Sequence, residues 1–225
     1  FTVGFDAEYP PYGYMDENGE YTGFDLELAQ AVCDLEGWEL VKKPINWDSK
    51  DMELNSGSID CIWNGFTMNG REDDYTFSDS YVDNSQVIVV AEDSGIDTLD
   101  ALAGKVVGVQ AASAALELLQ SEEEGGQKAL ADTFGSLNEF ADYNTAFTEL
   151  QAGALDALAI DIGVAKYQIK SRGDGYKIVD ETLNTEQYAV AFKKGNQELC
   201  DKINADLQKL TDDGTVAELA EKYEI

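Results

Sequence analysis

One stretch decides the fold, and it reads IDCIWNGFTMNGR over residues 59–71. Four of the five residues from Ile59 to Trp63 are apolar, which indicates a strand packed in a core. Small and polar residues follow this strand, and Arg71 comes just past them. In open α/β sheets, ligands bind at the edge where the strands end. The stretch therefore predicts one strand of an α/β fold with a binding site after it.

The same alternation of strand and helix continues on both sides of this stretch. It predicts a largely parallel α/β architecture that occurs twice. The expected strands cover residues 2–5, 40–43, 59–63, 87–90, 105–109, 155–160 and 188–192. The expected helices cover residues 24–35, 50–55, 98–102, 113–119, 145–152 and 215–222, with a further helix after the N-cap Asn196 that carries Leu199, Ile203, Leu207 and Leu210 on one stripe.

Composition narrows the class of protein. The chain has 225 residues, 44% of them hydrophobic, which suffices for the core of one large or two small domains. Its formal net charge of -30 would repel a phosphate backbone, so we expect no nucleic-acid partner. No apolar run approaches the roughly 20 residues that cross a bilayer. Any leader or lipid anchor is expected to precede Phe1, which already lies in the first strand.

Histidine and cysteine usage argues against most catalytic and metal sites. The chain has no histidine, which excludes Ser-His-Asp and Cys-His catalysis and the commonest metal ligand. Cys33, Cys61 and Cys200 lack C-x-x-C spacing, and we expect buried packing for all three. A disulfide between two of them stays open, while at least one thiol is free. We expect no metal and no cofactor.

Arg71 is the first candidate for binding a ligand. Its guanidinium could form a bidentate pair with a carboxylate, and nearby hydroxyl and backbone N–H groups would complete the site. The alternative is an ordinary surface salt bridge. A second candidate segment, Asp6 to Tyr12, places acids and aromatics on a proline-containing turn after the first strand. Asp16 to Gly19 reads as a hairpin turn, and Gly23 to Leu28 as the structural start of a helix.

The whole chain resembles the amino-acid-binding proteins of ATP-driven uptake systems, which have the type II periplasmic-binding-protein fold. The resemblance is carried by an ordered set of blocks: Tyr9–Tyr12, Gly23-Phe24-Asp25, the run from Gly65 to Tyr81 with its F-S-x-x-Y ending, Gly108-Val109-Gln110, the strand that ends at Asp161, and Lys193-Lys194-Gly195-Asn196. It implies two lobes, residues 1–87 plus 191–225 and residues 88–190. Crossing strands near 86–92 and 186–192 would form the hinge.

The resemblance also implies roles for individual residues. Arg71 would pair with the ligand α-carboxylate, helped by Thr67 and the backbone of Gly65, and Asp161 would take the α-ammonium. Trp47 and Tyr9 would enclose the ligand side chain, although core packing is the plain alternative for either ring. Further positions near the ligand are Asp6, which could instead cap the strand end, and the amides Asn64 and Gln110.

Two departures from the family pattern affect the carboxylate site. Relatives read G-T-T where this chain has Ala112-Ser113-Ala114, which loses a glycine and a hydroxyl. The backbone N–H groups of Ser113 and Ala114 at a helix N-terminus would still favour an anion. The loop before Arg71 is one residue shorter than usual, so its side chain would enter at a different angle.

Three functions fit these features. The first is a solute-binding protein, not an enzyme, that delivers a free, polar or basic L-amino acid to the permease subunits of an ABC transporter. The second is an enzyme that resembles cyclohexadienyl or arogenate dehydratases, and the third is the ligand-sensing domain of a larger receptor. For the first we expect a monomer, either a cell-surface lipoprotein made with a signal peptide or a periplasmic protein. The ligand stays open among glutamine, arginine, lysine, histidine and a larger polar ligand.

Overall fold

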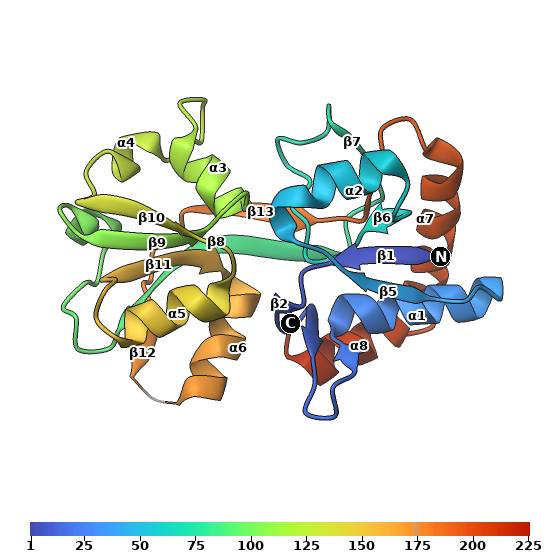
Figure 1. Ribbon diagram of the computed structural model, residues 1–225, viewed down its shortest axis with the longest axis horizontal. Helices are drawn as coiled ribbons and strands as arrows, with labels where there is room; N and C mark the ends of the chain where they lie inside the picture. The colour runs from blue at the N-terminus through green and yellow to red at the C-terminus, as the bar shows by residue number, and fades with distance from the viewer. Residues whose placement is uncertain (174) are drawn as a thin grey trace. The chain divides into compact units, whose positions relative to one another are not determined.

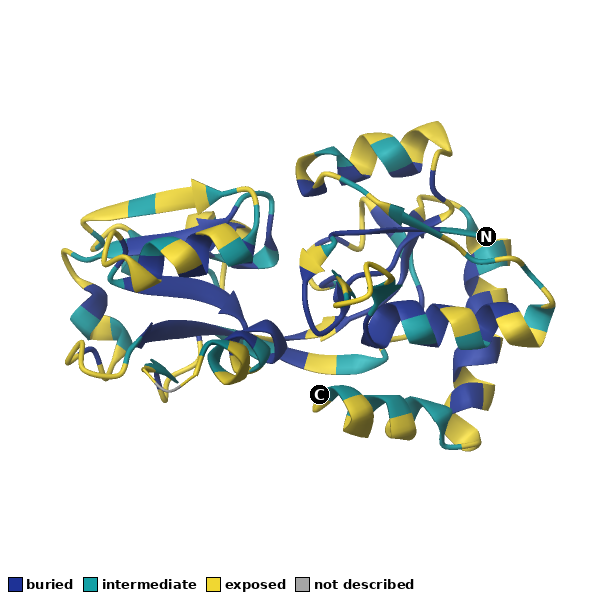
Figure 2. Cartoon of the chain, turned by 60° about the horizontal axis from the view of Figure 1, so that its bottom comes forward, coloured by how far each residue is buried: buried dark blue, intermediate teal, exposed yellow. Residues whose placement is uncertain are grey.

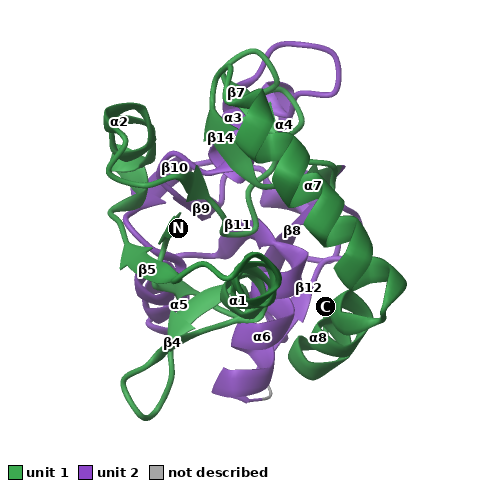
Figure 3. Cartoon of the chain, turned by 90° about the vertical axis from the view of Figure 1, so that its right-hand side faces the viewer, with its two compact units in different colours: residues 1–83, 186–225 green, residues 84–185 purple. Residues whose placement is uncertain are grey.

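A computed structural model of the protein describes residues 1–173 and 175–225. The chain divides into two compact units, coloured separately in Figure 3. Unit 1 contains Phe1–Asp83 and Glu186–Ile225, and unit 2 contains Asn84–Thr185. The chain leaves unit 1 within strand β8 (Val82–Ala91) and returns within β13 (Asn184–Tyr188), and these two strands pair with each other. The predicted boundaries, after residues 87 and 190, lie a few residues further along the chain.

Unit 1 is built on a five-stranded sheet with the order β5-β1-β6-β14-β7, and Figure 1 labels its strands β5, β1, β6 and β7. Strands β1 (Thr2–Phe5), β5 (Val41–Pro44) and β6 (Cys61–Ile62) are parallel. Strand β14 (Ala191–Lys193) runs antiparallel to β6 and to β7 (Tyr75–Phe77). The final segment of the chain therefore supplies a central strand of the sheet that the first segment begins.

Helical segments of unit 1 lie in both the first and the last part of the chain. They are α1 (Phe24–Glu36), the single turn η1 (Trp47–Ser49), α2 (Lys50–Ser56), α7 (Gln197–Asp212) and α8 (Thr215–Tyr223). Helix α7 buries Ile203, Leu207 and Leu210, as predicted, whereas Leu199 is partly exposed. Asn196 occupies the N-cap position of this helix, but its side chain makes no capping hydrogen bond.

A small separate sheet precedes α1. Its strands are β2 (Glu8–Tyr9), β3 (Gly13–Met15) and β4 (Tyr21–Thr22). The predicted turn between β3 and β4 is present, because the Asp16 carboxylate accepts hydrogen bonds from the backbone N–H groups of Asn18 and Glu20 at 2.8 and 2.9 Å. This sheet makes the turn after β1 a rigid structure.

Unit 2 repeats the α/β arrangement around a second sheet, with the order β10-β9-β11-β8-β12 and β13 paired to β8. Strand β9 (Val106–Gln110) is parallel to β10 (Ser136–Phe140) and β11 (Ala157–Asp161), while β8 is antiparallel to β11 and to β12 (Tyr176–Ile178). The helices are η2 (Leu99–Leu102), α3 (Ala114–Gln120), α4 (Lys128–Ala131), α5 (Tyr143–Gln151) and α6 (Ile162–Arg172). Strands buried on both faces form the core, dark blue in Figure 2.

The single strand predicted over residues 188–192 is wrong in detail, because two strands meet there. The backbone between β13 and β14 leaves the ladder to bond elsewhere. Ala189 N–H donates to the Phe66 carbonyl at 3.0 Å, and Val190 N–H donates to Ser78 Oγ at 2.9 Å. These bonds let one apolar run serve both the crossing between units and the sheet of unit 1.

The three cysteines are buried and unpaired, so no disulfide forms between any two of them. Burial raises the pKa of Cys200 to about 11 and raises the pKa values of Cys33 and Cys61 as well. Within the described residues, no helix combines the length and apolarity needed to span a membrane.

Gly23, the N-cap of α1, provides a test of the local packing. Its φ is +130°, and a Cβ added there would lie 2.2 Å from the Tyr12 carbonyl oxygen. We expect Gly23→Ala to lower the free energy of unfolding by about 3 kcal/mol, from strain plus the clash. Urea unfolding measures this loss. The matched control is Gly19→Ala, where φ is +82° and nothing lies within 4 Å, so about 1 kcal/mol of backbone strain is expected. Equal losses in both variants would contradict the role of the contact.

Candidate functional site

Unit 1 brings its predicted site residues to one edge of its sheet. Asp6 and Tyr9 follow β1, and Trp47 follows β5, while Asn64, Gly65, Thr67 and Arg71 follow β6. Because these three strands are parallel neighbours, the segments after them meet at their carboxyl ends. All seven residues are buried. A buried set of polar and aromatic groups at this edge is the arrangement that the sequence predicted.

Arg71 is not a surface residue, since only 6% of it is exposed. Its guanidinium carbon lies 4.6 Å from the centroid of the Phe66 ring, and Nη1 donates to the Thr67 carbonyl at 3.3 Å. The aromatic face and the carbonyl hold the guanidinium in place. This burial favours a role in binding an anion over the exposed salt bridge that was the alternative.

Thr67 is tied to Glu186, a residue that the sequence analysis missed. The Thr67 hydroxyl donates to Glu186 Oε1 at 2.7 Å, and Glu186 is itself buried on the crossing strand β13. Since the hydroxyl proton is used here, Thr67 Oγ1 can only accept a further hydrogen bond. This geometry suits a ligand donor better than the carboxylate that the resemblance assigned to Thr67.

Further hydrogen bonds join the loop after β6 to the same crossing strand. Met68 N–H donates to the Gln187 carbonyl at 2.9 Å, and Gln187 N–H donates to Asn69 Oδ1 at 2.7 Å. Thr67 also forms an isolated antiparallel bridge with Tyr188. The loop that carries the predicted ligand residues therefore lies firmly against β13.

Asp6 and Asn64 are joined through the first turn. The Asn64 side-chain oxygen accepts from the Asp6 backbone N–H at 3.2 Å, and Asp6 Oδ1 accepts from Glu8 N–H at 2.9 Å. The second bond is the capping role that stood as the alternative for Asp6. A carboxylate that caps with one oxygen still has acceptor capacity for a ligand.

Gly65 has a backbone that only glycine adopts easily, with φ at +56°. A Cβ there would meet the rings of Tyr188, Tyr9 and Tyr12 at 3.0 to 3.3 Å. Its N–H donates to Asp25 Oδ2, so this donor already has a carboxylate partner within the chain, and the backbone role that the resemblance implied for Gly65 stays a prediction.

Asp25 was interpreted as a purely structural part of the α1 start, yet it is completely buried. Burial raises its pKa from 3.8 to about 7, while the hydrogen bond from Gly65 N–H acts in the opposite direction. The folded chain therefore holds this proton more tightly than the unfolded chain does. The resulting contribution to stability is present at low pH and is lost as the pH rises from about 4 through 7.

In unit 2, Asp161 is the last residue of β11 and is 3% exposed. Its Oδ1 accepts hydrogen bonds from Asn84 Nδ2 at 2.8 Å and from Gln86 Nε2 at 2.6 Å, both from β8. Sequence reasoning missed both amides, although two polar residues just before the apolar run 87–90 are a signal that could have found them. Because amides carry no net charge, they orient the carboxylate without neutralising it.

The other predicted residues of unit 2 lie between β9 and α3. Gln110 ends β9, and its Nε2 donates to the Ala141 carbonyl at 3.2 Å. Ser113 is the N-cap of α3, with its Oγ accepting from Leu116 N–H at 3.2 Å, and Ala114 is the first helical residue. Ala112 has φ of 55°, in the left-handed region that favours glycine.

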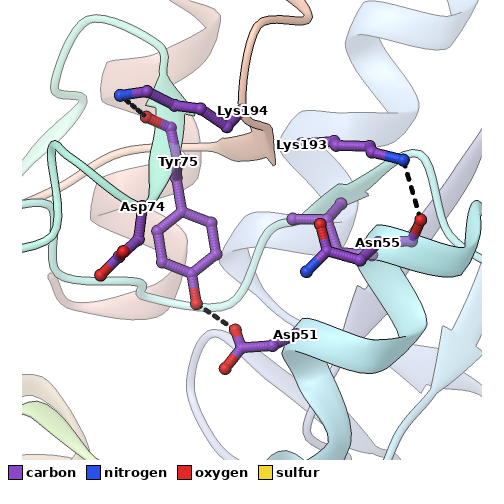
Figure 4. A pocket seen from close by; sticks show the side chains of 7 residues that line it. Asp51, Asn55, Asp74, Tyr75, Lys193 and Lys194 are labelled. Carbon is purple, nitrogen blue, oxygen red and sulfur yellow. Dashed lines mark hydrogen bonds between the residues drawn. The ribbon is translucent and has the colours of Figure 1, made fainter.

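A pocket of about 340 Å³ in unit 1 is lined by none of the residues predicted to bind the ligand (Figure 4). The polar groups that line it form hydrogen bonds with one another. The Tyr75 hydroxyl donates to Asp51, Lys193 Nζ donates to the Asn55 carbonyl at 2.9 Å, and Lys194 Nζ donates to the Tyr75 carbonyl at 3.2 Å. The block Lys193-Lys194 thus helps join β14, β7 and α2.

Across the described residues, no cluster of three or more acids or cysteines could hold a metal ion.

Comparison with known proteins decides the family. Residues 1–224 match the family of bacterial extracellular solute-binding proteins, family 3. The chain belongs to this family. A member from Escherichia coli (strain K12), the L-cystine-binding protein TcyJ, is 30% identical over 224 residues, which cover 98% of this chain and 81% of that protein.

Solved structures agree with this assignment and with the predicted type II fold. An ancestral arginine-binding protein bound to arginine has a TM-score of 0.88 and 38% identity, and the match covers 99% of this chain and 96% of that one. The ancestral amino-acid-binding protein AncCDT-1, a precursor of cyclohexadienyl dehydratase, has a TM-score of 0.89 and 30% identity, covering 99% and 94%. The predictions of fold and of an amino-acid-binding family are confirmed.

Proposed function

We propose that this family member captures a free, polar or basic L-amino acid and delivers it to the permease subunits of an ABC transporter. The observation that carries the proposal is a pair of buried, oppositely charged groups, Arg71 in unit 1 and Asp161 in unit 2. Arg71 binds the α-carboxylate and Asp161 binds the α-ammonium of one ligand. Each ligand charge then has a partner when the ligand leaves water.

The site chemistry supports a ligand with a polar or positively charged side chain. Asp6 and Glu186 add two buried carboxylates to the sheet edge that holds Arg71. The acceptor-only hydroxyl of Thr67 favours a donor on the ligand, and the amides of Asn64 and Gln110 offer both donors and acceptors. Tyr9 and Trp47 provide aromatic surface for its aliphatic part, and a guanidinium or ammonium also stacks well on such rings. Arginine, which a solved relative binds, meets all of these requirements.

The proposed cycle uses the two crossing strands as a hinge. The ligand first meets unit 1 through Arg71, and bending in β8 and β13 then lets unit 2 add Asp161 and the start of α3. Hydrogen bonds join the loop after β6 to Glu186 and Gln187 of β13. They would couple a ligand contact at this loop to the conformation of β13. Closure of this kind is a common response of two-lobed binding proteins to their ligands.

A thermal-shift screen of the twenty amino acids tests the proposed function. A ligand at about 100 times its Kd adds about 2.7 kcal/mol of stability. For a chain of this size that raises Tm by roughly 5 to 10 °C. We expect arginine or another polar or basic amino acid to produce this shift. A folded protein whose Tm no amino acid changes would contradict the proposal.

An enzyme on this fold is the second candidate, because AncCDT-1 shows that the fold stands close to a dehydratase. We propose that the present chain has no such activity, since Asp161 suits an amino group and no cleft lysine pairs with a second acid among the residues assigned to the site. Turnover of prephenate or arogenate by the purified protein would reverse this assignment.

The sensing-domain alternative would use the same ligand chemistry. We further propose a monomeric extracytoplasmic protein, either a cell-surface lipoprotein or a periplasmic protein.

A further inference from the structure

Two motifs that the proposed function does not use meet at Gly65. One is Gly23-Phe24-Asp25 at the start of α1, and the other is the F-S-x-x-Y run that ends at Tyr81. Asp25 Oδ2 accepts the hydrogen bond from Gly65 N–H, although the two residues are 40 positions apart. Burial first and the charge of Asp25 second raise the pKa of Tyr81 well above its usual value, but its hydroxyl and Asp25 Oδ1 are buried without a hydrogen bond to each other.

The position of Tyr81 is fixed by rings of the unit 1 core. Its ring stacks on Phe24 with centroids 6.2 Å apart, and it meets the edge of Trp63 at 6.2 Å. Asp25 is fixed by α1, whose first N–H bonds, from Phe24 and Asp25, go to the carbonyls of Pro11 and Tyr12. Asp25, which accepts the Gly65 N–H, is thus held at the start of a helix.

Gly65 needs such support because it has no side chain to hold its peptide. The three tyrosine rings around it restrict space, but they do not choose which way the N–H points. In a trans peptide the N–H and the preceding carbonyl lie on opposite sides. Asp25 therefore sets the direction of the Asn64 carbonyl as well as that of the Gly65 N–H. Asn64 and Gly65 both belong to the predicted amino-acid site.

We propose that Asp25 is a positioning residue that fixes the Asn64–Gly65 peptide at the binding site and thereby sets the affinity for the amino acid. This inference rests on the proposed function. Asp25 does not need to touch the ligand, since it acts through the orientation of one peptide group. An ionised carboxylate accepts a stronger hydrogen bond from an N–H than a protonated one does, so the peptide is held best when Asp25 is charged.

The affinity should consequently depend on pH near neutrality. Asp25 has a pKa of about 7, and the titratable groups that face it or its partner are Tyr81, Tyr12 and Cys61. The pKa values of Tyr81 and Cys61 are shifted further upward, out of this range. The chain contains no histidine, which is the usual source of titration between pH 6 and 8. Affinity is expected to rise with pH through this interval.

The Gly65 amide reports on the arrangement without any ligand. We expect its proton resonance, in a 15N-labelled sample of the whole chain, to shift with pH with a midpoint near 7. The shift should vanish in Asp25→Asn, whose amide keeps the shape but not the charge. A Gly65 amide that is insensitive to pH in the wild-type protein, or that titrates equally in Asp25→Asn, would overturn the proposal.

Calorimetry with L-arginine and L-glutamine at pH 6 and pH 8 completes the test. We expect wild-type affinity to increase severalfold at the higher pH, and Asp25→Asn to bind roughly tenfold more weakly at pH 8 with no pH dependence. The control is Asp206→Asn, a buried carboxylate of the same unit on α7 that pairs with Lys209, and it should keep the wild-type profile.

The outcomes separate this inference from the proposed function. Unchanged affinity and pH profile in folded Asp25→Asn would overturn the positioning role while leaving amino-acid binding intact. If the folded wild-type protein bound no amino acid, the proposed function would fail, and the Gly65 titration would still decide whether Asp25 controls this peptide.

Discussion

Replacing Arg71 with alanine is expected to weaken amino-acid binding by at least about 100-fold. The guanidinium is buried against Phe66, and its removal would leave the ligand carboxylate desolvated without a partner. Breaking a buried charge pair in this way costs about 3 to 5 kcal/mol. Isothermal titration calorimetry with the amino acid that gives the largest thermal shift measures the loss.

A matched control exists in unit 2. Arg172 also stacks on a phenylalanine, with its guanidinium carbon 5.3 Å from the Phe147 ring centroid, and it lies at the end of α6. Arg172→Ala should keep wild-type affinity. Arg71→Lys should bind better than Arg71→Ala but less well than the wild type, since an ammonium cannot pair with both carboxylate oxygens in a fork. Near wild-type affinity in Arg71→Ala would remove this residue from the site.

Replacing Asp161 with asparagine is the second change with a large expected effect. Asparagine preserves the size of the side chain and an oxygen that can accept from Asn84 and Gln86, so the fold of unit 2 should survive. The charge that meets the ligand ammonium is lost, and we expect affinity to fall by about 100-fold. Calorimetry measures the affinity, and circular dichroism of the same sample establishes that the variant is folded.

Asp156→Asn is the control for this change. Asp156 lies just before β11, and its carboxylate accepts from Val106 N–H at 2.8 Å, a structural bond within unit 2. This variant should lose some stability but keep its affinity. If Asp161→Asn and Asp156→Asn bind equally well, Asp161 does not carry the ammonium end.

Periodicity predicted the elements whose burial follows a simple pattern. Helix α1 and the sheet strands β1, β9 and β11 are such elements, and the structure places them within a residue or two of expectation. Strand β10 was missed because it lies at a sheet edge with mostly exposed side chains. Helix α6 was missed because the residues that it buries include glycine, alanine and glutamine, which produce no apolar stripe.

Much of the site chemistry depends on contacts that sequence cannot reveal. Asp25 and Gly65 are far apart in the chain, and nothing in either motif indicates that a helix start and a loop share a hydrogen bond. Glu186 looks like one more acid in a chain with 45 acidic residues. Its burial and its bond to Thr67 arise only when β13 lies against the loop after β6. The sequence therefore indicated which kinds of residue lie near the site, but it did not indicate their hydrogen-bond partners.

The order of the strands in unit 1 affects how the protein folds during its synthesis on the ribosome. Strand β14 sits between β6 and β7, so the sheet begun by the first 83 residues stays incomplete until residues 191–193 have been made. Unit 2, by contrast, is one uninterrupted segment. Ribosomes add roughly 5 to 20 residues per second. Unit 2 is therefore expected to fold before unit 1, whose incomplete sheet stays exposed until β14 has been synthesised.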